Sequence, residues 1–174
     1  QNKNITPIIV AFFTLAINYG TRGSFGLFLK PLEGEFETSR AVISSILSIT
    51  MLTYSALAFF TGYLIDRFGP KVVLLIGGLL AATSFMVSSA ATSLLQITLS
   101  FGIIFGAATC FLSQITAVSL LVKLPSGGNT LALGLVGSGP AIGSLFLSPS
   151  IAALIVSIGW RSTMKVIGWS FLIY

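Results

Sequence analysis

Long apolar runs alternate with short polar connections along the chain, and this pattern predicts membrane-spanning helices. A hydrocarbon core of about 30 Å needs roughly 20 residues of helix to cross it. Five runs reach that length, over residues 5–29, 41–64, 72–91, 94–122 and 131–158. A sixth run begins near residue 162 and reaches only residue 174, so we expect an incomplete span there. Because the runs are continuously apolar, they do not fit the alternating segments of a membrane β-barrel.

The polar connections between the runs are too short to hold a separate soluble domain. The first connection has the sequence KPLEGEFETS, and the others are IDRFGPK, a turn around residues 92–93, KLPSGGNT and GWR. We therefore expect an all-α polytopic transmembrane bundle over residues 1–174, with its function carried by the helices themselves.

Composition and charge exclude the usual water-soluble classes. Of the 174 residues, 55% are hydrophobic and 7% are charged, with a mean hydropathy of +1.01. A soluble domain carries about 25% charged residues, so the expected partner is the lipid bilayer. The net charge of +5 comes from basic residues scattered singly between apolar runs, which predicts no nucleic-acid surface.

The residue types that usually carry chemistry are scarce. The sequence has no histidine, and its single cysteine, Cys110, lies inside an apolar run. Histidine is the commonest metal ligand and general base, and no nucleophile has a base to activate it. The sequence therefore predicts no metal site, no cofactor and no enzymatic activity.

The most specific motif, GYLIDRFGPK at residues 62–71, lies between the second and third runs. It resembles the signature G-x-L-x-D-R-x-G-x-K/R of the major facilitator superfamily at every defined position. The resemblance implies a cytoplasmic gating loop, a cytoplasmic amino terminus and a multi-pass protein of the cell membrane. An acid and a base at a helix end also form ordinary solvated caps. The candidate gating residues are Gly62, Asp66, Arg67, Gly69 and Lys71.

A second motif, GLVGSGPAIGS at residues 134–144, is similar to the glycine-and-proline motif in the fifth helix of many facilitator antiporters. Glycines spaced by four, as at Gly139 and Gly143, let helices approach closely. Pro140 removes one backbone hydrogen bond and permits a kink. These residues therefore predict either a gating hinge in the fifth helix or plain helix packing.

Two further segments narrow the resemblance within the superfamily. The sequences YGTRGSFGLFLKPL at residues 19–32 and GWR at residues 159–161 look like the branch that holds monocarboxylate transporters and oxalate–formate antiporters. This resemblance implies a small organic anion, such as a monocarboxylate or dicarboxylate, carried by alternating access. A complete facilitator has two six-helix halves. The chain then corresponds to the amino-terminal half, with a missing carboxy-terminal half or a second copy as its partner.

A polar stripe in the first span marks the candidate substrate site. Thr14, Asn18 and Arg22 are spaced by four and share one helix face. An arginine inside a span costs about 2.5–3.5 kcal/mol on insertion scales and usually faces a cavity or a partner. We predict that Arg22 binds a carboxylate, with Asn18 and Tyr19 as hydrogen-bond donors beside it.

Two alternatives to this site remain open at the level of sequence. Arg22 lies roughly 10 Å of helix before the end of the first run, so its side chain can also extend to the outer interface. The large amide of Gln114, in the fourth run, is a further candidate to line the solute path opposite Arg22. A non-transporting bundle with an accessory or receptor-like role is the alternative function, and it would keep the polar stripe away from water.

Overall fold

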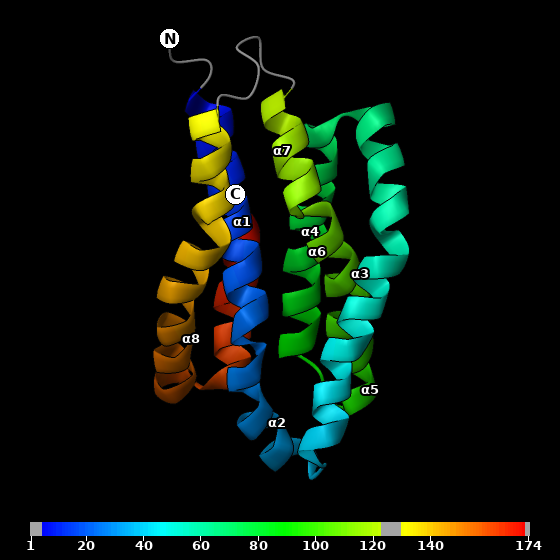
Figure 1. Cartoon of the computed structure of the whole chain (residues 1–174). Helices are drawn as coiled ribbons and strands as arrows, with labels where there is room; N and C mark the ends of the chain where they lie inside the picture. The colour runs from blue at the N-terminus through cyan, green and yellow to red at the C-terminus, as the bar shows by residue number, and fades with distance from the viewer. Residues whose placement is uncertain (1–4, 123–129, 173–174) are drawn as a thin grey trace.

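The computed structural model describes residues 5–122 and 130–172, and its regular structure is helical (Figure 1). Five helical stretches in this part of the chain are long and apolar enough to cross a membrane. The prediction of an all-α bundle is confirmed. Most of the expected connection between the fourth and fifth spans lies outside the described residues, as do the two ends of the chain.

The first span is longer than its apolar run. Helix α1 (Ile5–Gly23) continues through a short 3-10 helix, η2 (Ser24–Phe28), into α2 (Leu29–Phe36). Residues 30–36, at the start of the expected connection KPLEGEFETS, are therefore helical. The reason is burial, since Leu32 is fully buried and Phe36 packs against the core. Packing of these two apolar side chains stabilises this helix. The polar residues around them interrupt the apolar run, so the hydropathy pattern did not predict the helix.

Helices α3 (Arg40–Phe68) and α4 (Pro70–Ser89) are joined through a single residue, Gly69. Gly69 has a φ of +83°, a backbone angle that residues with a Cβ rarely adopt. Its N–H donates to Ile65 O at 3.0 Å, and Pro70 then starts α4 with a φ already suited to helix. The second glycine of the sequence motif thus makes a sharp reversal, at the end of the bundle where α1 begins (Figure 1). We call this the Gly69 end.

The fourth span is not one continuous helix. It consists of α5 (Leu94–Ile97), a π-helical stretch η3 (Thr98–Phe105), α6 (Gly106–Phe111) and α7 (Gln114–Val122). Leu112 leaves helical geometry with φ −88° and ψ 21°, so α6 and α7 are separated by a break at residues 112–113. The apolar run gave no sign of this interruption.

Helix α8 (Thr130–Leu172) contains the fifth and sixth runs as two arms. Gly159, with φ 80° and ψ 161°, is non-helical and reverses the chain direction between them. Figure 1 shows the first arm descending beside α1 and the second arm returning behind it. This corner lies at the same end of the bundle as α2, which we call the α2 end.

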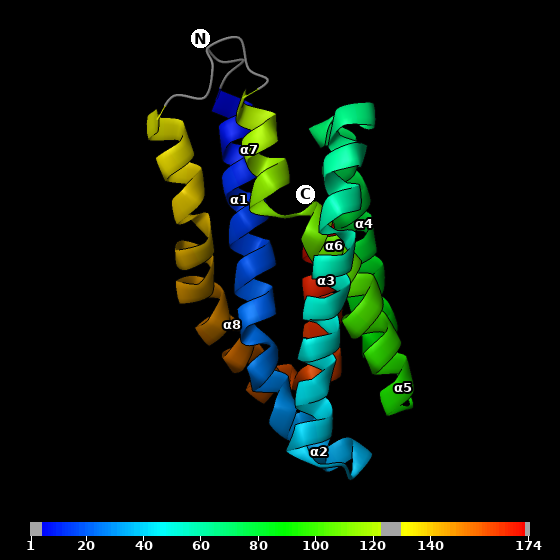
Figure 2. The ribbon, with the colours of Figure 1, turned by 45° about the vertical axis from the view of Figure 1, so that its right-hand side comes forward.

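The helices divide into two groups around an aromatic core. In Figure 2, α1 stands beside the first arm of α8, while α3, α4 and α5 stand together on the other side. Phe25 from η2 lies 4.2 Å from Phe101 of η3 between ring centroids, and Phe85 of α4 lies 5.0 Å from Phe105. Aromatic pairs at such distances add to the apolar area they bury. The Phe25–Phe101 pair joins the two groups toward the α2 end, and the Phe85–Phe105 pair packs within one of them.

Candidate functional site

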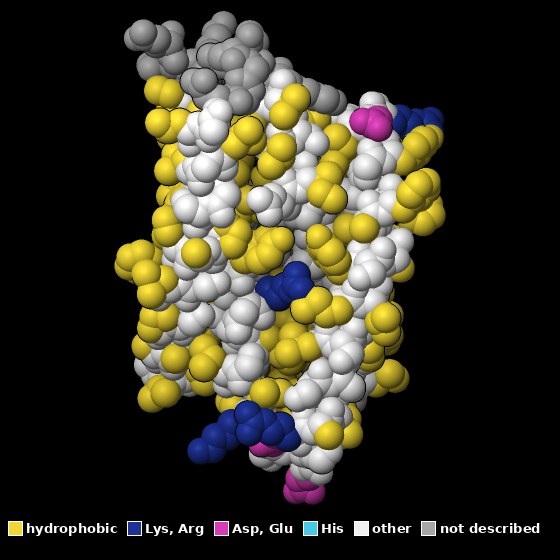
Figure 3. Space-filling view, in the orientation of Figure 1, with side chains coloured by type: hydrophobic (Ala, Val, Ile, Leu, Met, Phe, Trp, Pro, Cys, Tyr) yellow, Lys and Arg dark blue, Asp and Glu magenta, His cyan; other side chains and the backbone are white. Residues whose placement is uncertain are grey.

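Arg22 lies in the last turn of α1, on the face that α1 shares with α3. Its guanidinium lies over the ring of Tyr54, with 5.6 Å from Cζ to the ring centroid, and one of its nitrogens points at Met51 Sδ. Figure 3 shows one basic side chain about halfway along this face, among apolar side chains and away from the charged groups at either end. No carboxylate of the described residues pairs with Arg22.

Tyr54 and Met51 belong to the site although sequence reasoning did not select them as site residues. They are three residues apart on α3 and therefore share a helix face. Tyr19 of α1 is half-buried, and Gln114 is exposed at the first position of α7. An aromatic residue inside an apolar run carries no distinctive sequence signal, so only the fold reveals that Tyr54 lies beneath Arg22.

The predicted polar stripe divides into buried and accessible parts. Thr14 and Asn18 are each 2% exposed, whereas Arg22 is half-buried. The Thr14 hydroxyl donates to Val10 O within its own helix at 2.7 Å. The Asn18 amide donates to two carbonyls at the break of the fourth span, Leu112 O at 3.0 Å and Thr109 O at 3.4 Å.

The candidate gating residues lie at the Gly69 end and are mostly exposed. Arg67 donates to the Tyr63 hydroxyl at 2.8 Å, and its guanidinium lies 5.4 Å from the ring centroid of Phe68. Asp66 makes no hydrogen bond or ion pair with any of the residues that the structure describes. Gly62 has open space where a Cβ would stand. The carboxylate of Asp66 is thus free for a partner outside the described chain.

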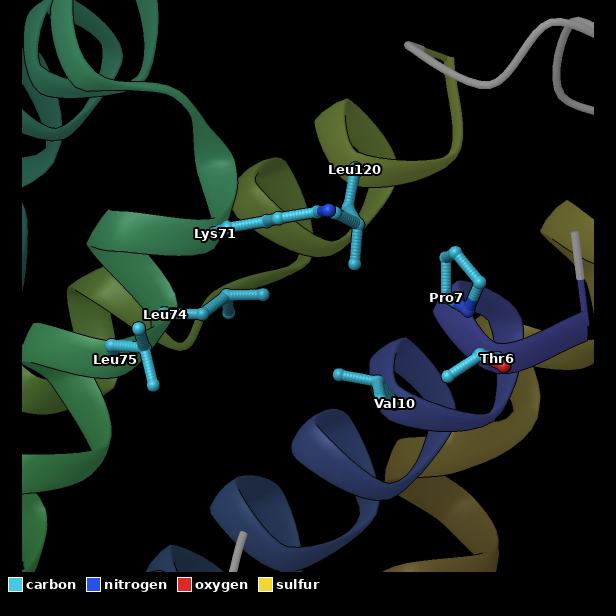
Figure 4. A pocket seen from close by; sticks show the side chains of 7 residues that line it. All are labelled: Thr6, Pro7, Val10, Lys71, Leu74, Leu75 and Leu120. Carbon is cyan, nitrogen blue, oxygen red and sulfur yellow. The ribbon is translucent and has the colours of Figure 1, made fainter. Parts of the chain in front are cut away.

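A cavity of about 390 Å³ lies at the same end, between α1, α4 and α7. Lys71 extends across it toward Leu120, as Figure 4 shows. The lining is otherwise mostly apolar and consists of Thr6, Pro7, Val10, Leu74, Leu75 and Leu120, together with Lys71. None of the four predicted substrate residues lines this cavity, so the cavity and the Arg22 face are separate places on the molecule.

Gly139 and Gly143 of the second motif lie where α1 crosses the first arm of α8. A Cβ at Gly139 would stand 2.9 Å from Phe12 O, and one at Gly143 would overlap Ala16 O. The helix continues regularly at Pro140, whose carbonyl accepts a hydrogen bond from Ser144 Oγ at 2.8 Å. The crossing therefore requires glycine for close packing, and a hinge role for these residues stays a prediction.

A polar cluster at the α2 end ties three elements together. Glu35 of α2 accepts from Trp160 Nε1 at 2.6 Å and forms an ion pair with Arg161 at 2.6 Å. The same arginine donates to Ser89 O, at the end of α4, at 3.0 Å. The GWR segment is thus a structural corner rather than part of the Arg22 face. No group of metal-binding side chains gathers here or elsewhere in residues 5–122 and 130–172.

Comparison with known proteins gives one family and several distant relatives. The family model of the Major Facilitator Superfamily matches residues 11–174. Monocarboxylate transporter 13 of Rattus norvegicus is 32% identical over 137 residues, which cover 79% of this chain and 32% of that protein. Monocarboxylate transporter 7 of Homo sapiens is 33% identical over 110 residues, which cover 63% and 21%.

A third relative is named for efflux. The agnestins efflux protein AgnL12 of Paecilomyces divaricatus is 28% identical over 147 residues, covering 82% of this chain and 33% of that protein. The chain thus spans about a third or less of the length of these three relatives.

Proposed function

Because the chain belongs to the major facilitator superfamily, a family of membrane transporters and not of enzymes, we propose that it is the amino-terminal half of a secondary transporter for a small organic anion. The monocarboxylate transporters among its relatives support the anionic class of the solute. Under this proposal a carboxy-terminal half, or a second copy of this chain, covers the Arg22 face and encloses the solute between the two halves.

The observation that carries the proposal is the position of Arg22. Its guanidinium lies inside an apolar span, half-buried, and no described carboxylate neutralises it. A charged side chain within a membrane span raises the free energy of the folded protein, and such residues usually line a substrate or ion pathway. A guanidinium holds a carboxylate by two parallel N–H···O bonds, whereas the Tyr54 ring beneath it offers only a weaker cation–π contact. A carboxylate solute would therefore outcompete the present contacts.

The remaining predicted residues fit two further roles. Under this proposal Tyr19 and Gln114 offer neutral hydrogen-bond donors to the solute, and Tyr54 holds the guanidinium of Arg22 on the face. We assign the Gly69 end to the cytoplasm of a cell membrane, with the amino terminus on the same side. The other half is then contacted in one of the two transport states by Asp66, Arg67 and Lys71.

The crossing of α1 and α8 has a further proposed role. Helix α8 slides along α1 at Gly139, Pro140 and Gly143.

The proposal is tested by transport in liposomes with the full-length protein. The probes are radiolabelled lactate and oxalate, with glycerol as an uncharged control. We expect uptake of at least one anion, and a loss of affinity of about 10- to 100-fold in Arg22→Gln, because a hydrogen bond to a charged group contributes about 1.5–3 kcal/mol. Arg22→Lys should fall between Arg22→Gln and the unaltered protein, since an ammonium keeps the charge but not the fork.

The matched control is Arg40→Gln, which removes an exposed arginine at the start of α3 and should leave uptake unchanged. Equal affinity in Arg22→Gln and the unaltered protein would remove the anion site. A folded protein that moves none of the probes would favour the non-transporting bundle.

A further inference from the structure

We propose that Asn18 is a positioning residue that caps the broken fourth span and so fixes the start of α7, where Gln114 lies. The inference rests on the proposed function for its transport readout and goes beyond it in assigning Asn18 a structural partner instead of the solute. Three observations carry it: the geometry of the break, the hydrogen bonds of Asn18, and the buried polar atoms around them.

The break leaves a carbonyl without its helical donor. In a continuous α-helix the N–H of Ser113 would bond to Thr109 O. It bonds instead to Cys110 O at 3.2 Å, because Leu112 has left helical geometry. No water is at hand in the hydrocarbon region to replace the missing donor, and each unsatisfied backbone group there is costly. A broken span therefore needs a donor from a neighbouring helix.

Asn18 supplies that donor from α1. Its Nδ2 donates to Leu112 O at 3.0 Å and to Thr109 O at 3.4 Å, across 94 and 91 residues of sequence. A side-chain amide has two N–H groups, one for each carbonyl. With 2% of its surface exposed, Asn18 is not open to the Arg22 face. It acts as a helix cap provided from another part of the chain.

Three polar atoms beside this cap have no partner within the described chain. They are Asn18 Oδ1, Ser113 Oγ and Thr116 Oγ1, and the exposure of their side chains is 2% or less. Buried atoms without partners are uncommon in folded proteins and call for an explanation. One is an acceptor, and the two hydroxyls are donors. The break therefore contains hydrogen-bonding groups that its present arrangement does not use.

The position of Asn18 explains how a buried residue influences the solute face. Arg22 follows one turn later on α1, and Gln114 begins the helix that the cap holds. Asn18 thus lies between two residues proposed to contact the solute, and it affects Gln114 through the backbone of the break. Losing the cap should misplace Gln114 while leaving Arg22 in place.

The test measures the accessibility of position 114 directly. In the full-length protein without its native cysteines, Gln114→Cys is labelled by a membrane-impermeant methanethiosulfonate. Asn18→Leu and Asn18→Asp both remove the N–H donors in a side chain of similar size. We expect either to change the labelling rate by about tenfold, given the cost of unsatisfied buried carbonyls. Thr14→Val is the matched control, since it removes a buried hydroxyl bonded only to its own helix.

Transport kinetics separate positioning from solute contact. A positioning role predicts that Asn18→Leu changes the labelling rate of position 114 and the transport kinetics together, because a misplaced Gln114 contacts the solute less well. A raised KM with unchanged labelling would show that Asn18 contacts the solute, and unchanged values of both would show that the cap has no role. Either result overturns the proposal. Labelling requires no transported solute, so it decides the role of Asn18 even if the anion proposal fails. Asn18→Asp keeps the test valid if the leucine variant does not fold.

Discussion

At the scale of single residues, one polar stripe on α1 contains two different chemical environments. Arg22 is half-buried on an open face above an aromatic ring, whereas Asn18, one turn earlier, is enclosed and bonded to carbonyls of another span. Spacing by four predicted that the two residues share a helix face. It did not predict their partners, because a partner more than 90 residues away depends on how the helices pack.

Cys110 offers a direct check of packing at this scale. Its thiol is 2% exposed and lies 3.0 Å from the Thr61 hydroxyl, between α6 and α3. We expect no reaction with a fluorescent maleimide until the protein unfolds on heating, because the reagent cannot reach a thiol packed between helices. The measurement is labelling as a function of temperature in detergent. An introduced Gln114→Cys is the control and should react at once. Rapid labelling of Cys110 in the cold would contradict the packing of α6 on α3.

At the scale of elements, the crossing of α1 and α8 depends on missing side chains. Gly143 of α8 lies against Ala16 of α1, and a Cβ at Gly20 would stand 2.6 Å from Leu147 Cδ1. Small residues at such a seam let helix backbones come into van der Waals contact. This packing stabilises helix association in lipid, where burial of apolar side chains gives no hydrophobic gain. We expect the same seam to be where one helix slides along the other.

Two glycines of α8 distinguish packing from helix propensity. Gly143→Ala should lower the free energy of unfolding by about 1–3 kcal/mol, the usual cost of overpacking a filled interface. Gly137→Ala, six residues earlier, has open space for its Cβ and should stabilise the helix by up to about 1 kcal/mol. The measurement is the Tm of each purified variant in the same detergent. Equal Tm values for the two variants would show that α1 and α8 do not cross at Gly143.

The apolar pattern predicted where the helices lie better than how they end and break. A continuous apolar run specifies a span, but it cannot show that α2 extends the first span, since Leu32 and Phe36 become informative only when the core that receives them is known. The break at Leu112 is similarly hidden, because its compensation by Asn18 comes from a distant segment. The turn at Gly69 was the most predictable local feature, because its motif is contiguous in sequence.

At the scale of the whole molecule, the two ends of the bundle differ in how their polar groups are satisfied. The α2 end contains the cluster in which Glu35 bonds Trp160 and Arg161. At the Gly69 end, Asp66 is without a partner in the described chain, and Lys71 extends across a cavity. At the α2 end Glu35 is therefore paired within this chain, whereas Asp66 at the Gly69 end has no partner among the described residues.

The cluster at the α2 end should contribute to stability. Glu35→Gln removes the ion pair with Arg161, whose two side chains are 38% and 36% exposed. For a pair this accessible we expect a loss of up to about 1 kcal/mol, or about 2–4 °C in Tm. Glu37→Gln, an exposed neighbour at the end of α2, should leave the Tm unchanged. The same Tm for both variants would show that the cluster does not stabilise the fold.

The Gly69 end should matter for transport more than for folding. Asp66→Asn removes a charge that nothing in the described chain pairs with, so the yield of folded protein should stay within about twofold of the unaltered protein. Transport should slow by about tenfold, as expected when a charged hydrogen bond to the other half is lost in one state. The measurements are folded yield by size-exclusion chromatography and initial uptake rate in liposomes. Equal losses in both would leave Asp66 only a structural role.

The cluster of Glu35, Trp160 and Arg161 also has a mechanical consequence. Helices fastened together at one end behave as rods fixed in a clamp, and the displacement that a given change of angle produces grows with distance from that clamp. The clamp lies at the α2 end, and residues 66–71 lie at the opposite one. We therefore expect a small tilt between α1 and the first arm of α8, along the glycine seam, to be amplified along the length of the spans into the largest movement at the Gly69 end.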